Sequence, residues 1–289
     1  MTMTLAKIEE FVRGKIDEPT GGNYVPEDIA ISPECVSLKM FDAPLVGAAS
    51  CGDKMWVKLR EEGIIGSHFI LPNEWLPDAV SVISIFFPLT ERVSKSCADT
   101  PAWPSPEWLH ARTEGEEFIF EVTLALADEL SRTGHPSLVP PKDARFKSVR
   151  HLGSNPEMPG LSYTSVWSER HVAYVCGLGT FSLSKGLITK RGGAGRFGSV
   201  ITPLDLPPTE REYSGVYDYC VMCGACVRVC PAQAITLKGG KDHSICALFG
   251  DETKKKFNPR YGCGKCQVGM PCQSRAPGKN GRPKAAPAS

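Results

Sequence analysis

The hydrophobic pattern at the start of the chain is helical. Leu5, Ile8, Phe11 and Val12 recur at helical spacing, with polar residues between them. A stretch rich in Gly and Pro, residues 18–27, ends the pattern. The chain therefore predicts an N-terminal amphipathic helix followed by a loop, rather than a signal peptide.

Short apolar runs further along predict strands. Residues 80–89 are β-branched and aromatic, with a proline near the end, and residues 44–49 form a shorter apolar run. Residues 186–189 and 197–201 have a similar composition. We expect four strands, of which residues 80–89 are the clearest.

Two further segments have the pattern of helices. Residues 116–130 repeat apolar residues at helical spacing between charges, and Gly134 marks the end. Residues 165–176 predict another helix, terminated by Gly177 and Gly179. Strands mixed with helices in this order indicate an α+β fold.

Length and composition indicate two units. The 289 residues, 42% hydrophobic and 22% charged, suit a globular protein of one medium and one small domain. A proline-rich stretch, residues 203–208, leads into a cysteine-rich segment. We expect a larger domain over residues 1–205, a smaller one over 206–274, and a mobile basic tail over 275–289.

The charge balance excludes some classes of partner. Lys plus Arg number 33 against 32 Asp plus Glu, so the net charge of +1 predicts no general attraction to nucleic acid or anionic lipid. No stretch approaches the roughly 20 apolar residues that span a bilayer. We therefore expect a cytoplasmic protein with neither a membrane nor a nucleic-acid partner.

The cysteines indicate metal binding. Disulfides are rare in a reducing cytoplasm, and the chain has 12 cysteines. Eight of them lie close together between Cys220 and Cys272, which predicts metal ligation in one C-terminal module. The remaining four are scattered and are expected to be small buried residues: Cys35, Cys51, Cys97 and Cys176.

The spacing of the first four module cysteines, C-x2-C-x2-C-x3-C-P, is typical of bacterial ferredoxins with two [4Fe–4S] clusters. In that pattern the fourth cysteine serves the other cluster, and the clusters perform one-electron transfer. A pair of four-cysteine zinc sites is the alternative. The predicted ligands are Cys220, Cys223, Cys226 and Cys272 for the first cluster, and Cys230, Cys246, Cys263 and Cys266 for the second.

Several segments resemble the epoxyqueuosine reductases and the reductive dehalogenases. The likeness covers about residues 40–273 and is most specific at the cysteines. It rests on Ser-Ile-Cys-Ala-Leu-Phe at 244–249, Tyr-Gly-Cys-Gly-Lys-Cys-Gln at 261–267, Glu-Arg-His-Val-Ala at 169–173, Gly-Leu-Gly at 177–179, Gly-Leu-Ile-Thr at 186–189 and Phe-Gly-Ser-Val-Ile-Thr at 197–202.

This resemblance implies a nitroreductase-like domain that holds a base-off cobalamin beside a ferredoxin-like domain with two [4Fe–4S] clusters. Glycines would let the backbone approach a large flat cofactor, although a helix C-cap turn also explains Gly177 and Gly179. The implied cobalamin-binding residues are Gly177, Leu178, Gly179, Thr180, Phe181, Ser182, Gly186, Leu187, Ile188, Phe197, Gly198 and Ser199.

The cobalamin loop departs from the epoxyqueuosine reductase pattern. The substituted positions carry Thr180 for Trp, Ser182 for Gly, Leu183 for Lys and Ser184 for Asn. The proton-donating Asp of those enzymes corresponds to Tyr163, and reductive dehalogenases use a Tyr as the donor. Because a phenol keeps its proton at neutral pH, Tyr163 is the candidate catalytic acid; the alternative is that Tyr163 caps the helix expected from residue 165.

Arginines and a histidine in the same segments are candidates for anion binding. Arg170 and His171 could contact cofactor amides or phosphate, and Arg191 and Arg196 an anionic group. Solvated surface positions explain them equally well.

These residues favour an iron–sulfur oxidoreductase that transfers electrons from a low-potential donor, such as ferredoxin or flavodoxin, through the clusters to cobalamin for reduction of a small organic substrate. The alternative is a ferredoxin-type activating protein that reduces a corrinoid on a partner protein. A third hypothesis is epoxyqueuosine reduction in tRNA modification, against which the Asp-to-Tyr exchange argues.

Overall fold

The computed structural model describes residues 3–280, and its centre is a three-stranded antiparallel sheet. The strands are β1 (Leu45–Ser50), β2 (Ser81–Pro88) and β7 (Gly195–Thr202), in the order β1-β2-β7. Ile83 at the middle of β2 pairs with Ala48 on one side and with Val200 on the other. The strands predicted around residues 44–49, 80–89 and 197–201 are therefore confirmed.

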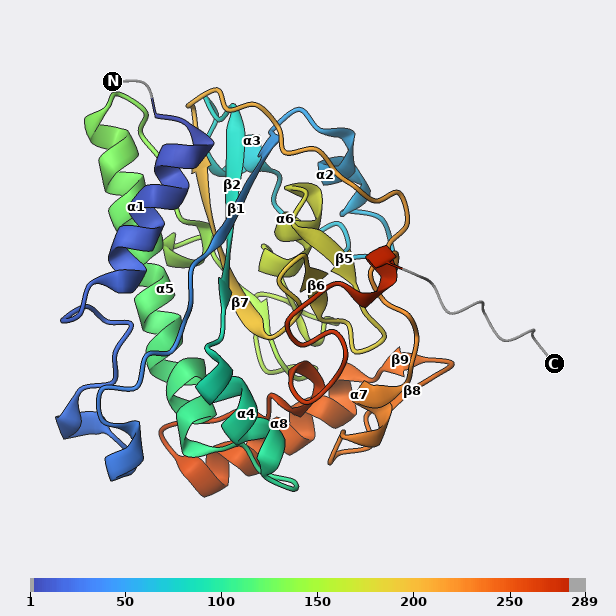
Figure 1. Cartoon of the computed structure of the whole chain (residues 1–289). Coiled ribbons are helices and arrows are strands. Elements are labelled where there is room, and N and C mark those ends of the chain that lie inside the picture. The colour runs from blue at the N-terminus through green and yellow to red at the C-terminus, as the bar shows by residue number, and fades with distance from the viewer. Residues whose placement is uncertain (1–2, 281–289) are drawn as a thin grey trace.

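Helices cover both faces of this sheet (Figure 1). The helices α1 (Leu5–Asp17) and α5 (Pro106–Arg132) pack on one face, against Ile83, Ile85 and Phe87. The short helix α6 (Glu169–Val175) packs on the other face. Because both sides of β2 are covered, all eight of its residues are buried, which explains its continuous apolar sequence.

The long helix α5 begins ten residues before the predicted start at 116. Its first turn combines Ser105 as N-cap, whose Oγ accepts from Trp108 N at 3.2 Å, with Pro106 at the first helical position. The helix ends at Arg132, and Gly134 follows with a φ of +88°. The apolar pattern identified the body of this helix but not its cap.

The predicted helix over residues 165–176 is shorter in the structure. The hairpin of β3 (Ser148–Val149) and β4 (Thr164–Ser165) takes up its first residues. Trp167 then fills the space between hairpin and helix, stacking on Phe69 at a centroid distance of 5.4 Å. The helix therefore begins only at Glu169, after the N-cap Ser168.

The remaining elements surround this core and build the cysteine module. The hairpin of β5 (Gly179–Phe181) and β6 (Leu187–Thr189) follows α6, where only its second strand was expected. The other helices and strands are α2 (Lys54–Lys58), α3 (Pro72–Trp75), α4 (Glu91–Asp99), α7 (Ala225–Arg228), β8 (Ile235–Thr236), β9 (Gly240–Lys241), α8 (His243–Phe257) and 3-10 turns at Glu27–Ile29, Pro33–Cys35, Pro140–Lys142, Lys265–Gln267 and Pro277–Asn280.

The segments on either side of the cysteine module bind to the sheet region. Thr209 exchanges two hydrogen bonds with Ala48 of β1, both of 2.9 Å, in the stretch that leads into the module. After the module, Cys272 O and Gln273 O accept from the backbone N–H groups of Gly193 and Ala194. Of the predicted tail, residues 281–289 lie outside the described residues.

None of the helices between residues 3 and 280 is long and apolar enough to cross a membrane.

Candidate functional site

The first set of module cysteines lies on a tight loop that leads into α7. Met222 and Gly224 adopt left-handed backbone conformations, with φ of +51° and +68°, and these turn the chain around the thiols. Cys272 returns to this loop from the end of the chain. Burial raises the pKa of the Cys272 thiol to about 12, and the charges of Cys220, Cys223 and Cys226 add to the rise. These are the four thiols predicted for the first cluster.

The other four cysteines surround the start of α8. Burial raises the pKa of Cys246, and the neighbouring Cys266 and Cys230 add to this effect. Burial likewise raises the pKa of Cys263 to about 12, with contributions from Cys266 and Cys246. These mutual charge effects place thiols of each predicted set near one another, and eight cysteine thiolates are the donors that two [4Fe–4S] clusters require. Among the described residues, no three His, Cys, Asp or Glu side chains are arranged as a ready metal site. That each group holds a cluster stays a prediction.

The loop that carries Cys263 and Cys266 is held from both sides. Gly262 and Gly264 have φ of +104° and +72°, and a side chain at either would collide with Trp108 at the start of α5. Lys265 is 3% exposed. Its ammonium donates to the carbonyls of Cys97 and Thr100 at the end of α4, and to Thr100 Oγ1 at 2.6 Å.

Lys265 was not identified from the sequence. A lysine between two cysteines gives no sign that it will be buried, because its partners are carbonyls more than 160 residues away. Its cation sits at the C-terminus of α4, where the helix dipole favours positive charge.

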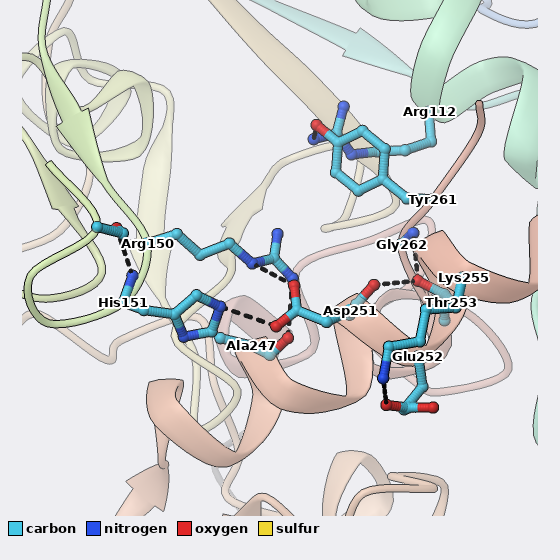
Figure 2. Close-up of polar contacts among 12 residues, drawn as sticks. Arg112, Arg150, His151, Ala247, Asp251, Glu252, Thr253, Lys255, Tyr261 and Gly262 are labelled. Carbon is cyan, nitrogen blue, oxygen red and sulfur yellow. Dashed lines mark hydrogen bonds and ion pairs between the residues drawn. The ribbon is translucent and has the colours of Figure 1, made fainter. Parts of the chain in front are cut away.

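A second set of polar contacts joins α8 to the residues that follow β3 (Figure 2). Asp251 on α8 pairs with Arg150 at 3.1 Å and with His151 at 2.8 Å. Arg150 also donates to Ala247 O at 2.9 Å. Arg150 and His151 follow β3 directly, so the β3–β4 hairpin, whose connection carries Tyr163, is fixed against the helix that carries Cys246.

Arg196, which was predicted to bind an anionic group, forms an ion pair within the protein. Glu116 on α5 accepts from Arg196 at 2.8 Å and from Arg112 at 2.5 Å. Burial alone would raise the pKa of Glu116, but the two guanidinium groups hold it below its ordinary value. Arg112 continues the network by donating to Tyr261 OH at 2.7 Å, beside the Cys263 loop (Figure 2).

The structure places Tyr163 beside the second cysteine group. Its ring stacks on His243 at a centroid distance of 4.4 Å, and His243 is the first residue of α8, one turn before Cys246. Tyr163 is 37% exposed and has a φ of +47°. The alternative that Tyr163 caps a helix is wrong, because α6 starts six residues later and has Ser168 as its N-cap.

Cations surround the Tyr163–His243 pair. Burial lowers the pKa of His243 to about 4, and Lys185, Lys241 and Arg170 lower it further by their charge. Arg170 donates to Lys185 O at 2.9 Å, which ties α6 to the turn between β5 and β6. The imidazole is therefore neutral at pH 7 and sits in a positive field.

The glycines of the predicted cobalamin loop are largely explained by the packing of the protein itself. Gly177, with φ of +80°, follows the C-cap of α6; its N–H and that of Leu178 bond the carbonyls of Tyr174 and Ala173, which is a Schellman motif. A side chain at Gly179 would strike the carbonyl of Ile188 on β6. The helix-cap alternative is thus confirmed for Gly177, whereas Gly179 begins a strand.

Most of the other predicted cobalamin-binding residues are also packed against the protein itself. A Cβ at Gly198 would meet α5 at 2.9 Å, and Ser199 is buried behind it. Phe181, Gly186 and Phe197 remain partly exposed, as does Gly177. The positions enclosed by the surrounding protein are Leu178, Gly179, Thr180, Ser182, Leu187, Ile188, Gly198 and Ser199. Their contact with a cofactor stays a prediction.

The residues that depart from the family pattern have local structural partners. Thr180 Oγ1 accepts from the backbone N–H of Tyr219 at 2.9 Å and so ties β5 to the cysteine module. Ser182 Oγ donates to Gly186 O at 2.9 Å and lies 3.0 Å from Ser184 Oγ, which closes the β5–β6 turn.

Glu169 is a second residue whose environment the sequence did not reveal. Oε1 accepts from Ser199 Oγ at 3.0 Å, whereas Oε2 is buried and finds no hydrogen-bond partner among the described residues. Burial raises the pKa of this carboxyl to about 7. The sequence shows only a Glu next to an Arg at this position. It does not indicate that the Glu169 carboxyl is turned into the protein while Arg170 is exposed.

The scattered cysteines are structural. Cys35, Cys51, Cys97 and Cys176 are all buried, as expected for small apolar residues. Cys176 is the C-cap residue of α6, and its thiol donates to Val82 O on β2 at 3.4 Å.

Comparison with known proteins identifies the module and its relatives. Residues 215–236 match the family of 4Fe–4S binding domains. The epoxyqueuosine reductase of Bacillus anthracis is 29% identical over 125 residues, which are 40% of this chain and 32% of that protein. The trichloroethene reductive dehalogenase of Dehalococcoides mccartyi is 38% identical over 100 residues, 33% of this chain and 18% of the relative. The matched segments thus span a third or less of each relative's own length.

Two solved structures are also similar. A crystal structure of an epoxyqueuosine reductase has a TM-score of 0.48 at 19% identity and covers 79% of this chain and 61% of its own. A catabolic reductive dehalogenase has a TM-score of 0.49 at 16% identity, with 80% and 30% covered. By sequence, the chain is thus similar over part of its length to an epoxyqueuosine reductase and to a reductive dehalogenase, and it contains a match to the 4Fe–4S binding domain.

Proposed function

We propose that this chain is an iron–sulfur reductase in which two [4Fe–4S] clusters carry electrons from an external ferredoxin or flavodoxin to a bound cobalamin, for reduction of a small organic substrate. The observation that carries the proposal is the ferredoxin-type spacing of the cysteines, which matches a 4Fe–4S binding domain at residues 215–236. Tyr163 stacks on His243, three residues before Cys246. The relatives' names support the reaction class.

Bound cobalamin would supply a strongly reducing metal centre that can open an epoxide or a carbon–halogen bond. The residues that would hold it are three of the four partly exposed members of the predicted set, Phe181, Gly186 and Phe197. Gly186 fits a close backbone approach, since a Cβ there would meet only the hydroxyls of Ser184 and Ser182. Lys185 and Arg170 next to it suit the phosphate of a cobalamin.

Tyr163 is the proposed proton donor. Its φ of +47° and its stacking on His243 hold the phenol at the first turn of α8, the turn that carries Cys246. A phenol at this place can donate its proton to a developing carbanion at the substrate.

Corrinoid uptake tests the proposal. The protein is purified without oxygen, loaded with iron and sulfide, and mixed with hydroxocobalamin; bound corrinoid is read from the visible spectrum and by mass spectrometry after gel filtration. We expect about one corrinoid per chain, and a Gly186→Trp variant that keeps its clusters but binds less. Protein that holds both clusters and retains no corrinoid would overturn the proposal.

An activating protein that reduces a corrinoid on a partner is the second candidate. The enclosure of eight of the twelve predicted cobalamin residues favours it. In that case the clusters would reduce a separately purified corrinoid protein, and free hydroxocobalamin would not bind. Epoxyqueuosine reduction remains a third candidate, which restoration of the modification in a deletion strain would establish.

A further inference from the structure

The net charge of +1 conceals an uneven distribution along the chain. Residues 219–289, which hold all eight module cysteines, contain twelve Lys and Arg against three Asp and Glu. Residues 219–241 contain Arg228, Lys238 and Lys241 and no carboxylate. Residues 219–289 therefore carry a net charge of +9, whereas residues 1–218 carry −8.

One cluster ligand reaches the surface of this cationic module. Cys223 is exposed, whereas the other seven module cysteines are partly or fully buried. It lies just before α7, which together with β8 and β9 forms a corner of the molecule (Figure 1). The first cluster would thus have one edge near solvent, where an external molecule can approach it closely.

Apolar and cationic side chains surround Cys223. Met222 and Leu237 are 43% and 66% exposed. Leu237 lies against Gly224, 3.1 Å from where a Cβ would stand, and Arg228 donates to Cys223 O at 3.3 Å. We call Met222, Cys223, Arg228, Leu237 and the exposed Lys238 the Cys223 face.

We propose that the Cys223 face docks a small acidic one-electron carrier protein. This inference rests on the proposed function, because it requires a cluster at the first cysteine group. Met222 and Leu237 give the apolar centre that protein interfaces use, and Arg228 and Lys238 attract carboxylates and speed the encounter. In each encounter the carrier loses one electron and the first cluster gains it; no bond or proton is exchanged.

A single-stranded nucleic acid is the other class of molecule that a cationic surface attracts. Such surfaces use aromatic rings on which the bases stack, whereas the apolar members of the Cys223 face are a methionine and a leucine. The side chains therefore favour a protein partner.

Charge reversal on this face tests the proposal in the cluster-loaded full chain. Arg228→Glu and Leu237→Glu are compared with Arg132→Glu, which makes the same charge change as Arg228→Glu on a 73% exposed side chain at the end of α5. A reduced acidic ferredoxin is mixed with each protein, and the loss of cluster absorbance is followed by stopped flow. Titanium(III) citrate serves as a small reductant that needs no docking.

We expect the second-order rate constant with ferredoxin to fall about tenfold or more in Arg228→Glu and Leu237→Glu, with a weaker salt dependence. Arg132→Glu should match the unaltered protein, and titanium(III) should reduce all four at equal rates. The proposal is overturned if ferredoxin reduces these two variants as fast as the unaltered protein. Binding of an RNA hairpin is measured in parallel, and its loss in the same variants at unchanged ferredoxin rates would also overturn the proposal. Because the assay needs no corrinoid, failed corrinoid uptake alone overturns only the proposed function.

Discussion

Replacing Lys265 by methionine tests how the second cysteine loop is held. Methionine keeps the length and apolar stem of the side chain but removes the ammonium, which donates to the Cys97 carbonyl and to both oxygens of Thr100. Lys265 is 3% exposed, so water does not readily replace the lost donors.

The expected loss of stability follows from the acceptors left behind. A buried acceptor without a donor costs about 1–3 kcal/mol. Cys97 is buried, so its carbonyl would lose its donor without gaining a water molecule and the full penalty applies. Thr100 is partly exposed, so water can hydrate its two oxygens in part and the penalty there is smaller. We expect Lys265→Met to lower the free energy of unfolding by about 2–4 kcal/mol.

The assay is urea denaturation in anaerobic reducing buffer, followed by tryptophan fluorescence. The matched control is Lys255→Met, because the Lys255 side chain is 73% exposed on α8 and its ion pair with Glu252 is at the surface. The control should change the free energy by less than about 0.5 kcal/mol. A loss below about 1 kcal/mol for Lys265→Met, or equal losses in both variants, would refute the reasoning.

Three further predictions concern single side chains. The pKa of Glu169 is about 7 in the folded protein and 4.5 for an ordinary Glu. Between these pH values the folded state binds one more proton than the unfolded state. The free energy of unfolding therefore falls as the pH rises from about 4.5 to 7 and is constant above that range. Glu169→Gln should therefore gain up to about 3 kcal/mol relative to the unaltered protein between about pH 5 and pH 8, measured by urea denaturation; a pH-independent difference would contradict this. Lys241 donates to Cys266 Sγ at 3.3 Å, so Lys241→Met should lower the midpoint potential of the second cluster by roughly 60 mV in an EPR-monitored titration, and an unchanged potential would disprove the role. Tyr163→Phe should retain both clusters and the bound corrinoid but lose about 10²–10⁴-fold in substrate-dependent oxidation of reduced methyl viologen; full turnover would exclude Tyr163 as the donor.

The sequence predicted the elements whose signal is local. The apolar run of β2 identified the central strand because both of its faces are covered, and the periodicity of α1 and α5 identified their buried sides. The spacing of the first four module cysteines predicted the 4Fe–4S binding domain for the same reason, since that pattern lies within one short segment, residues 215–236. The amphipathic signal did not give the start of α5, which is set by Ser105 and Pro106.

The features that were missed depend on contacts between distant segments. Trp167 shortens α6 because it packs against Phe69, almost a hundred residues earlier. The burial of Lys265 depends on the end of α4, and the stacking of Tyr163 on His243 requires the β3–β4 hairpin to be clamped to α8 by Asp251. For the glycines, the local helix-cap alternative is confirmed at Gly177, whereas the packing of Gly179 on Ile188 depends on the hairpin partner strand β6.

Anaerobic reduction of the corrinoid-loaded protein by a reduced ferredoxin tests the central claim most directly. Cluster and corrinoid absorbance are followed together in the unaltered protein and in Cys263→Ser, which removes one ligand of the second group. The account predicts that the clusters are reduced first and the corrinoid spectrum changes afterwards, and that the second change is lost in Cys263→Ser. Reduced clusters beside an unchanged corrinoid spectrum, or corrinoid reduction that does not depend on Cys263, would contradict it.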